Sequence, residues 1–218
     1  MPPSLVLLLA CLAAPGDEWP QWGGPNRDFR APSAELADSW SERGPRVLWE
    51  RDLGNGTSAI VVGGDTLFTV FGAEMRETVV ALDADTGRTL WSRAHPVSYE
   101  AHRADYGGPH STPLLVGELV ITVSIDARVR AFARRDAALR WSRDLVREHD
   151  VELPQSGYAA SPLSWGDLVL LPGLGGSAPG ALALSAASGE TVWARHAFLS
   201  SHASPLLVDL GGRDQVVF

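Results

Sequence analysis

Four tryptophans recur along the chain at related positions, and this repeat constrains the fold more than any other feature. Trp49, Trp91, Trp141 and Trp193 are separated by 42, 50 and 52 residues. The last three close similar segments, "ALDADTGRTLW" (81–91), "AFARRDAALRW" (131–141) and "ALALSAASGETVW" (181–193). A period of this length, with several short apolar runs in each unit, is typical of propeller blades, whereas helical arrays would show an apolar period of about 3.6 residues.

Each unit contains four short apolar runs separated by turn residues, which predicts a four-stranded blade. We expect an all-β fold, a β-propeller with blades at about 57–94, 111–144 and 160–196 and the start of a further blade at 203–218. Residues 46–53 have the pattern of an outer strand that closes a blade. About four blades' worth of sequence is present, so we expect a C-terminally truncated copy of a ring of about seven or eight blades, with a four-bladed ring as the alternative.

Asp83 and Asp85 raise the question of a metal site, because calcium loops alternate oxygen ligands along the chain. The rest of such a loop is missing, and the second copy of the repeat has Ala133 and Arg135 at these positions. A ligand role is therefore not a property of the repeat. We interpret the two acids as turn formers that accept hydrogen bonds from their own backbone.

Composition agrees with many short strands, since the 218 residues include 22 Gly, 15 Pro and eight Trp. The 18 basic and 26 acidic residues give a formal charge of -8. This charge opposes binding to phosphate backbones, so we expect no nucleic-acid partner.

The N-terminus has the pattern of an export signal, which we place at residues 1–16. Its apolar run "LVLLLACLAA" (5–14) is too short to span a bilayer, although the preceding "MPPS" lacks the usual Lys or Arg. Cys11, the only cysteine, lies where a bacterial lipoprotein would be acylated, and simple cleavage nearby is the alternative. The expected location is the periplasm or cell envelope, or the outside of the cell. A lead-in segment at 17–45 then precedes a partial propeller domain at 46–218.

The motif A-x-D-x-x-T-G-x-x-x-W, matched by Ala81, Asp83, Thr86, Gly87 and Trp91, resembles the repeat of PQQ-like, quinoprotein-type propellers. The lead-in "WPQWGGPNRDF" (19–29) is similar to the "W-P-x-W-R-G-P-x-R-D-G" opening of exported bacterial members of this family and departs from it at Gly23 and Phe29. The family includes PQQ-dependent alcohol dehydrogenases and the non-enzymatic, BamB-like assembly lipoproteins.

The resemblance implies that each repeat tryptophan docks on the neighbouring blade. The structural docking residues would be Trp49, Trp91, Trp141, Trp193, Gly87 and Gly189. The dehydrogenases of the family would hold PQQ and calcium with a Glu, an Asn and an Asp base, several with adjacent cysteines. This chain has no adjacent cysteines, and its two asparagines, Asn26 and Asn55, match no such ligand position. We therefore assign no catalytic residue and no metal ligand, and expect no cofactor.

A long inter-blade loop at 95–110 carries the polar residues most suited to binding at the rim. The candidates are His102, Arg103, Asp105, Tyr106 and His110. Three of them, His102, Asp105 and His110, could also form a surface metal site, but their spacing matches no standard ligand motif, which favours a polar rim.

The function that this sequence favours is a binding or scaffold module that presents inter-blade loops to a protein or a surface polymer. One alternative is a PQQ-dependent periplasmic dehydrogenase whose catalytic blades lie beyond the C-terminus, with PQQ and calcium as cofactors. The other is a BamB-type outer-membrane assembly factor anchored by a lipid on Cys11.

Overall fold

The computed structural model describes residues 18–31, 38–98, 108–150, 153, 156–195 and 202–218. Within these ranges the chain forms three four-stranded sheets and one two-stranded sheet, all antiparallel. The first sheet comprises β1 (Val61–Gly63), β2 (Thr66–Ala73), β3 (Arg76–Asp83) and β4 (Thr89–Pro96). The second comprises β5 (Leu114–Val116), β6 (Leu119–Val123), β7 (Arg128–Ala133) and β8 (Leu139–Asp144), and the third β9 (Leu163–Trp165), β10 (Leu168–Pro172), β11 (Ala181–Ser185) and β12 (Thr191–Arg195). The last hairpin is β13 (Leu206–Asp209) and β14 (Asp214–Val217).

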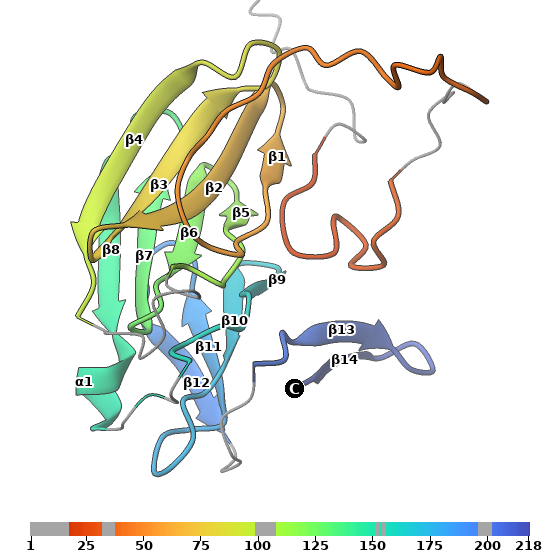
Figure 1. Ribbon diagram of the computed structural model, residues 1–218. Helices are drawn as coiled ribbons and strands as arrows, with labels where there is room; N and C mark the ends of the chain where they lie inside the picture. The colour runs from red at the N-terminus through yellow and green to blue at the C-terminus, as the bar shows by residue number, and fades with distance from the viewer. Residues whose placement is uncertain (1–17, 32–37, 99–107, 151–152, 154–155, 196–201) are drawn as a thin grey trace, which may run out of the picture.

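Each four-stranded sheet is a meander in which strands adjacent in sequence are paired. The three sheets fan around one side of the molecule, with β1, β5 and β9 innermost and β4, β8 and β12 outermost (Figure 1). This arrangement confirms the prediction of an all-β, partial propeller built from four-stranded blades. The sequence did not predict the one short helix of the described chain, α1 (Leu145–His149), which follows β8 and begins at the capping side chain of Asp144.

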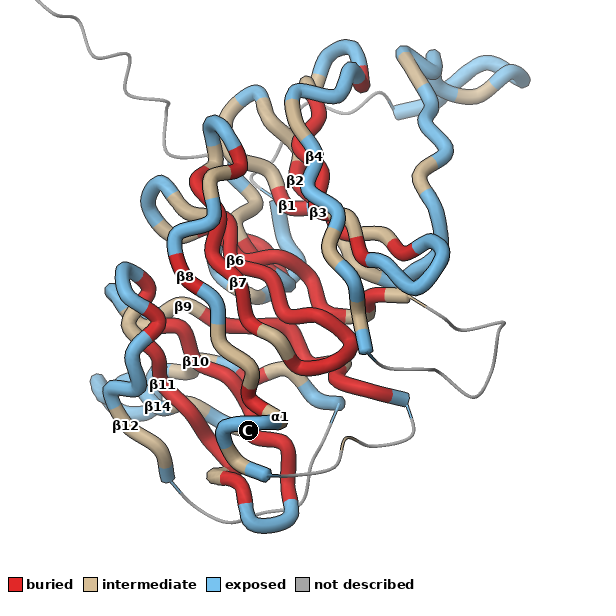
Figure 2. Tube along the Cα trace, turned by 90° about the vertical axis from the view of Figure 1, so that its left-hand side faces the viewer, coloured by how far each residue is buried: buried red, intermediate tan, exposed pale blue. Residues whose placement is uncertain are grey.

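Three apolar cores lie between successive blades of the described chain. The first joins Val61, Phe68 and Val79 to Phe132 of the second blade, and the second core joins Ile121 and Val129 to residues of the third blade such as Leu171 and Leu182. The third core packs Leu163 and Leu170 against the last hairpin. Burial is greatest in the middle strands of the second and third blades. The strands β6, β7, β10 and β11 are covered on both faces, while the outer strands β4 and β12 are largely exposed (Figure 2). Each buried Leu, Ile or Phe stabilises the stack by about 1.5–3 kcal/mol, so no blade is expected to be stable alone.

The turn between the third and fourth strands has the same backbone form in every four-stranded blade. The strand register shifts at one equivalent place, after Ala81, Ala131 and Ala183. The turn then passes through a left-handed residue, Gly87 (φ 66°), Ala137 (φ 57°) or Gly189 (φ 73°). In the first blade the Asp83 carboxylate accepts hydrogen bonds from the Thr86 backbone N–H (2.9 Å) and hydroxyl (2.6 Å). These bonds hold the pKa of Asp83 below its usual value, and they give it the structural role expected of a turn former.

Three of the repeat tryptophans reach across to this turn in the next blade. The indole N–H of Trp49 donates to the Ala84 carbonyl (2.9 Å), that of Trp91 to Arg134 (2.6 Å) and that of Trp141 to Ala186 (2.8 Å). The rings of Trp49 and Trp141 also lie against Gly87 and Gly189, where a β-carbon would have no space. Trp193 packs against the third core, together with Leu207 and Val216 of the last hairpin.

An arginine two residues after each of these three tryptophans makes a second contact with the same turn. Arg51 donates to the Gly87 carbonyl (2.6 Å) and Arg93 to the Ala137 carbonyl (3.4 Å). Arg143 donates to the Gly189 carbonyl and to the Thr191 hydroxyl (3.2 Å). The spacing W-x-R is visible in the sequence at all four repeat tryptophans, and these contacts explain it at Trp49, Trp91 and Trp141.

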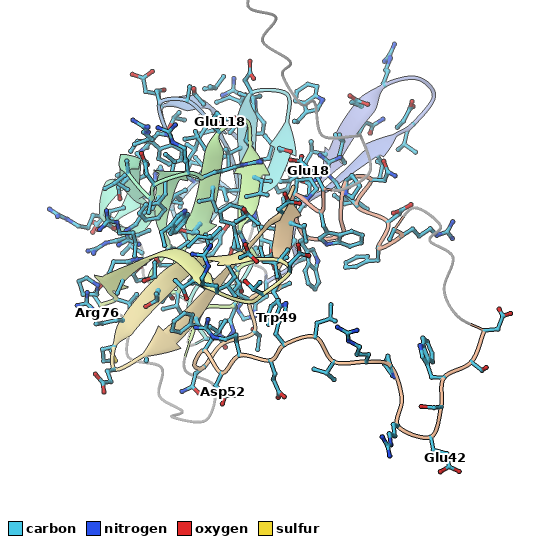
Figure 3. The ribbon with its side chains drawn as sticks, turned by 90° about the horizontal axis from the view of Figure 1, so that it is seen from above. Glu18, Glu42, Trp49, Asp52, Arg76 and Glu118 are labelled. Atoms are coloured by element: carbon cyan, nitrogen blue, oxygen red, sulfur yellow. The ribbon has the colours of Figure 1, made fainter. Side chains whose placement is uncertain are left out.

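Residues 46–53, expected to be an outer strand, form no strand in the structure. The side chains of Trp49 and Arg51 link this segment to the first blade. An outer strand would need a neighbouring strand of its own blade to pair with, and residues 46–53 pair with none in the described chain. Figure 3 shows Trp49 beside the first blade, while the segment that carries Glu42 extends away from it. In the described part of the chain, no helix is long and apolar enough to cross a membrane.

Candidate functional site

The lead-in segment crosses the inner strands of three blades. Trp19 exchanges two backbone hydrogen bonds with Val62 of β1 (both 2.9 Å), and the Pro20 carbonyl accepts from the Leu115 N–H of β5 (2.7 Å). Arg27 donates to the carbonyl of Ser164 in β9. Figure 1 shows this part of the chain, in red and orange, alongside the inner strands. The segment therefore ties together the inner edges of the blades.

A belt of hydroxyl groups joins the same blades just before their inner strands. The Thr112 hydroxyl accepts from the Ala59 N–H (3.2 Å), the Ser161 hydroxyl from the Thr112 N–H (2.9 Å) and the Ser204 hydroxyl from the Ser161 N–H (2.8 Å). Each bond runs from one blade to the next. Thr112 and Ser161 are almost fully buried, so these bonds satisfy backbone groups that would otherwise be costly to bury.

A pocket of about 660 Å³ opens beside this belt, and we call it the inner-strand pocket. Its described lining consists of Trp22, Thr57, His110, Thr112, Ser156, Ala159, Ser161, His202, Ala203 and Ser204. Except for Trp22 from the lead-in, these residues lie near the amino-terminal ends of β1, β5, β9 and β13 or in the connections that lead to them. The volume is within the range of about 300–1,000 Å³ that is usual for sites of small ligands.

His110 lies in this pocket, at the entry to the second blade. Its Nδ1 atom is 2.9 Å from the Thr57 hydroxyl. Burial lowers the pKa of His110, the nearby His202 lowers it further, and Glu77 opposes the shift. The imidazole is therefore neutral at pH 7. Of the five rim candidates, His110 lies in the pocket, while His102, Arg103, Asp105 and Tyr106 lie outside the described residues, as does Cys11.

The pocket does not match the donors that calcium prefers. Calcium takes six to eight oxygen ligands and usually includes carboxylates. The described residues that line the pocket offer hydroxyls and imidazoles and include no carboxylate and no asparagine. Asn55 uses its backbone to pair with Gly72. The described lining therefore does not fit a quinone–calcium pair.

A second polar cluster lies between the first and second blades. Glu77, only 2% exposed, accepts a hydrogen bond from the Ile125 N–H (2.9 Å), and its other oxygen is 3.7 Å from His95. The Ser124 hydroxyl accepts from buried Arg130 (2.6 Å). Burial lowers the pKa of Arg130 and the Asp126 carboxylate opposes that shift. Because its carboxylate binds a backbone group across the interface, Glu77 has a structural role in the stack.

The repeat architecture also appears in comparisons with known proteins. A family model described as "Outer membrane protein assembly factor BamB" matches residues 37–213, which is most of the chain. The chain belongs to this family of PQQ-like propeller-repeat proteins. A search of curated proteins finds no match to this PQQ-like repeat protein.

Two solved dehydrogenase structures resemble this PQQ-like repeat protein in fold. The quinohemoprotein alcohol dehydrogenase ADHIIG from Pseudomonas putida HK5 gives a TM-score of 0.59 at 19% identity, covering 82% of this chain and 26% of that one. A europium-containing methanol dehydrogenase gives 0.57 at 18% identity, covering 82% and 32%. BamB from Moraxella catarrhalis gives 0.42 at 21% identity, covering 64% and 35%. The chain thus spans about a third or less of the length of each.

The sequence contains a signal for the pocket in the segments that align the repeats. The segments "STP", "ASP" and "ASP" at 111–113, 160–162 and 203–205 place Thr112, Ser161 and Ser204 at equivalent positions. Their hydroxyls form the belt. Trp22 is recognisable in the sequence as an aromatic residue near the start of the propeller, but its place in the pocket depends on the path of the lead-in across three blades.

Proposed function

We propose that this protein is an exported propeller that serves as a binding module, with its recognition surface at the end of the blades that carries the inner-strand pocket. The observation that carries the proposal is the position of this pocket. Because the strands are antiparallel, the amino-terminal ends of β1, β5 and β9 lie on the same face as the hairpins β2–β3, β6–β7 and β10–β11. We call this the pocket face.

The connections between blades reach the inner strands on this face as well, since each fourth strand ends there. The sequence between β4 and β5 (97–113) and that between β8 and β9 (145–162) are longer than any turn within the described blades. Connections on a rigid scaffold are where folds of this kind usually carry recognition. The opposite face carries the short turns that contact Trp49, Trp91 and Trp141, whose role is to join blades.

The partner in this proposal is a protein or a surface polymer outside the cytoplasm. Membership of a family described by an outer-membrane assembly factor supports both the location and a role in binding. We propose that the module works without PQQ or calcium, because the described lining of the pocket lacks the oxygen donors that calcium prefers. The formal charge of -8 supports a partner other than nucleic acid.

Site-specific photo-crosslinking tests which face binds. A photoreactive amino acid replaces exposed Ser156 on the pocket face, and a matched variant carries it at exposed Ala187, in the turn between β11 and β12. We expect the Ser156 variant to form a discrete cross-linked product in envelope extracts, and the Ala187 variant to form none. Equal labelling from both positions would contradict a recognition surface on the pocket face.

Titration with PQQ and calcium tests the competing enzymatic function. The purified protein is incubated with both, desalted, and assayed for quinone absorbance and for dye-linked oxidation of alcohols and sugars. We expect no retained quinone and no turnover. A stoichiometric quinone that supports dye reduction would replace the binding function with a dehydrogenase.

A further inference from the structure

The inner-strand pocket has a repeating wall in which successive blades contribute residues at equivalent positions. One row is the hydroxyl belt of Thr112, Ser161 and Ser204. Two residues earlier in the same segments come His110, Ala159 and His202, and Thr57 is equivalent in the first blade. Successive blades therefore place the hydroxyls of the belt at equivalent positions along the pocket, and the row before it is polar except at Ala159.

The belt offers hydrogen-bond donors to a ligand. A hydroxyl group has one proton to donate and two lone pairs that accept. In each of these three groups one lone pair already accepts a backbone N–H from the preceding blade, which fixes the oxygen in place. The hydroxyl proton is then directed away from that N–H, so the belt carries three positioned O–H groups.

Trp22 supplies the one large aromatic surface in the described lining of the pocket. Its side chain is 45% exposed, and its ring packs edge-to-face against Phe29, with centroids 5.1 Å apart and an interplanar angle of 84°. The lead-in holds it through the neighbouring Gln21, whose side chain accepts from the Ser164 N–H (3.4 Å). A fixed ring with an open apolar surface beside polar groups favours a ligand that has both an apolar and a hydroxylated side.

We propose that the inner-strand pocket binds a neutral saccharide, with one sugar ring against Trp22 and its hydroxyl groups on Thr112, Ser161 and Ser204. The inference rests on the proposed binding function and names the ligand class of that site. A sugar ring has an apolar C–H surface that fits an indole, and it has hydroxyls that both donate and accept. The described lining contains no carboxylate, lysine or arginine, and burial holds the pKa of His110 below its usual value, so the lining favours a neutral ligand over an ionic one.

The test uses the 218-residue protein on an array of neutral and anionic oligosaccharides, followed by titration calorimetry with the tightest neutral compound. Trp22→Ala removes the aromatic surface. Trp40→Ala is the matched control, because Trp40 is another exposed tryptophan (59%) of the lead-in that does not line the pocket. We expect Trp22→Ala to weaken saccharide binding about tenfold or more and Trp40→Ala to change it less than about twofold. Circular dichroism confirms that both variants are folded.

Two outcomes would overturn the proposal. One is the absence of neutral oligosaccharide binding at millimolar concentration, and the other is binding that Trp22→Ala leaves unchanged. Binding of phosphate or acetate that strengthens from about pH 8 to about pH 5.5 would also overturn the proposal and assign the pocket to anions, through protonation of His110. If Ser156 still cross-links to a partner while saccharides fail to bind or compete, the binding function stands and the saccharide inference alone falls.

Discussion

The indole ring of Trp141 lies against Gly189 of the next blade, so closely that a β-carbon at Gly189 would be 2.6 Å from the Cδ2 and Cε3 atoms of the ring. The same contact joins Trp49 to Gly87, at 2.5 Å from Cε3. In both turns the glycine serves two purposes, because it also adopts a positive φ angle. The glycine of the repeat is thus required by the backbone conformation and by the neighbouring blade together.

Gly189→Ala is expected to destabilise the protein by about 2–4 kcal/mol, because it adds left-handed strain to a clash with Trp141. Gly166→Ala is the matched control in the same blade, since Gly166 has φ 57° and a β-carbon added there would have no other atom within 4 Å. We expect the control to cost about 1 kcal/mol, from strain alone. The shift in urea midpoint measures both, and equal losses would contradict a steric role for Trp141.

Ala137→Gly is expected to change stability by less than about 1 kcal/mol. Ala137 occupies the equivalent turn of the second blade at φ 57°, and its side chain is buried. Glycine would relieve strain there, but it would lose a buried methyl group and gain entropy in the unfolded chain. Urea unfolding measures the change, and a loss of more than about 2 kcal/mol would contradict this near balance by showing that the buried methyl group of Ala137 outweighs the strain of its positive φ angle.

The strands could be predicted from the sequence because each apolar run is short and is bounded by turn residues, as around Gly87 and Gly189. The belt and the lead-in could not be predicted in this way. Thr112 and Ser161 contact each other across 49 residues, and Arg27 contacts Ser164 across 137. A pattern of polar residues does not show which blade a segment will contact. The sequence could therefore assign His110 to the inter-blade loop at 95–110, but it could not show that this residue lines the inner-strand pocket.

Glu148→Gln is expected to lower stability at pH 7 and to have no effect below the pKa of Glu148. Arg143 donates to both oxygens of Glu148 (2.8 and 2.9 Å), and these hydrogen bonds lower the pKa of Glu148 from its usual 4.5. Because the pKa of Glu148 is lower in the folded protein than in the unfolded chain, the pair with Arg143 stabilises the fold fully above about pH 4.5. This stabilisation is lost as the pH falls through the pKa of Glu148 in the folded protein.

Urea midpoints from about pH 7 to about pH 3 check this expectation. The midpoints of Glu148→Gln and the unchanged protein should differ at neutral pH and converge at the acid end. Glu118→Gln, at an exposed residue of the β5–β6 turn, controls for the loss of one negative charge. A difference between Glu148→Gln and the parent that stays constant down to the acid end would exclude the Arg143–Glu148 pair as its source.

Glu77→Ala is expected to destabilise the contact between the first two blades by about 1–3 kcal/mol, because it leaves the buried N–H of Ile125 without its acceptor. Glu77→Gln retains an amide oxygen that can accept this bond, so it should cost less. Hydrogen exchange at Ile125 reports the bond directly, and protection that survives in Glu77→Ala would contradict its importance.

The lead-in segment has a consequence for the order in which the chain assembles. Residues 18–29 precede their partners Val62, Leu115 and Ser164 in the chain, and the last of these partners follows more than a hundred residues later. Contacts between such distant residues form slowly, since the loop they close must be ordered first. We therefore expect the lead-in to reach its place after the three blades that it crosses have stacked.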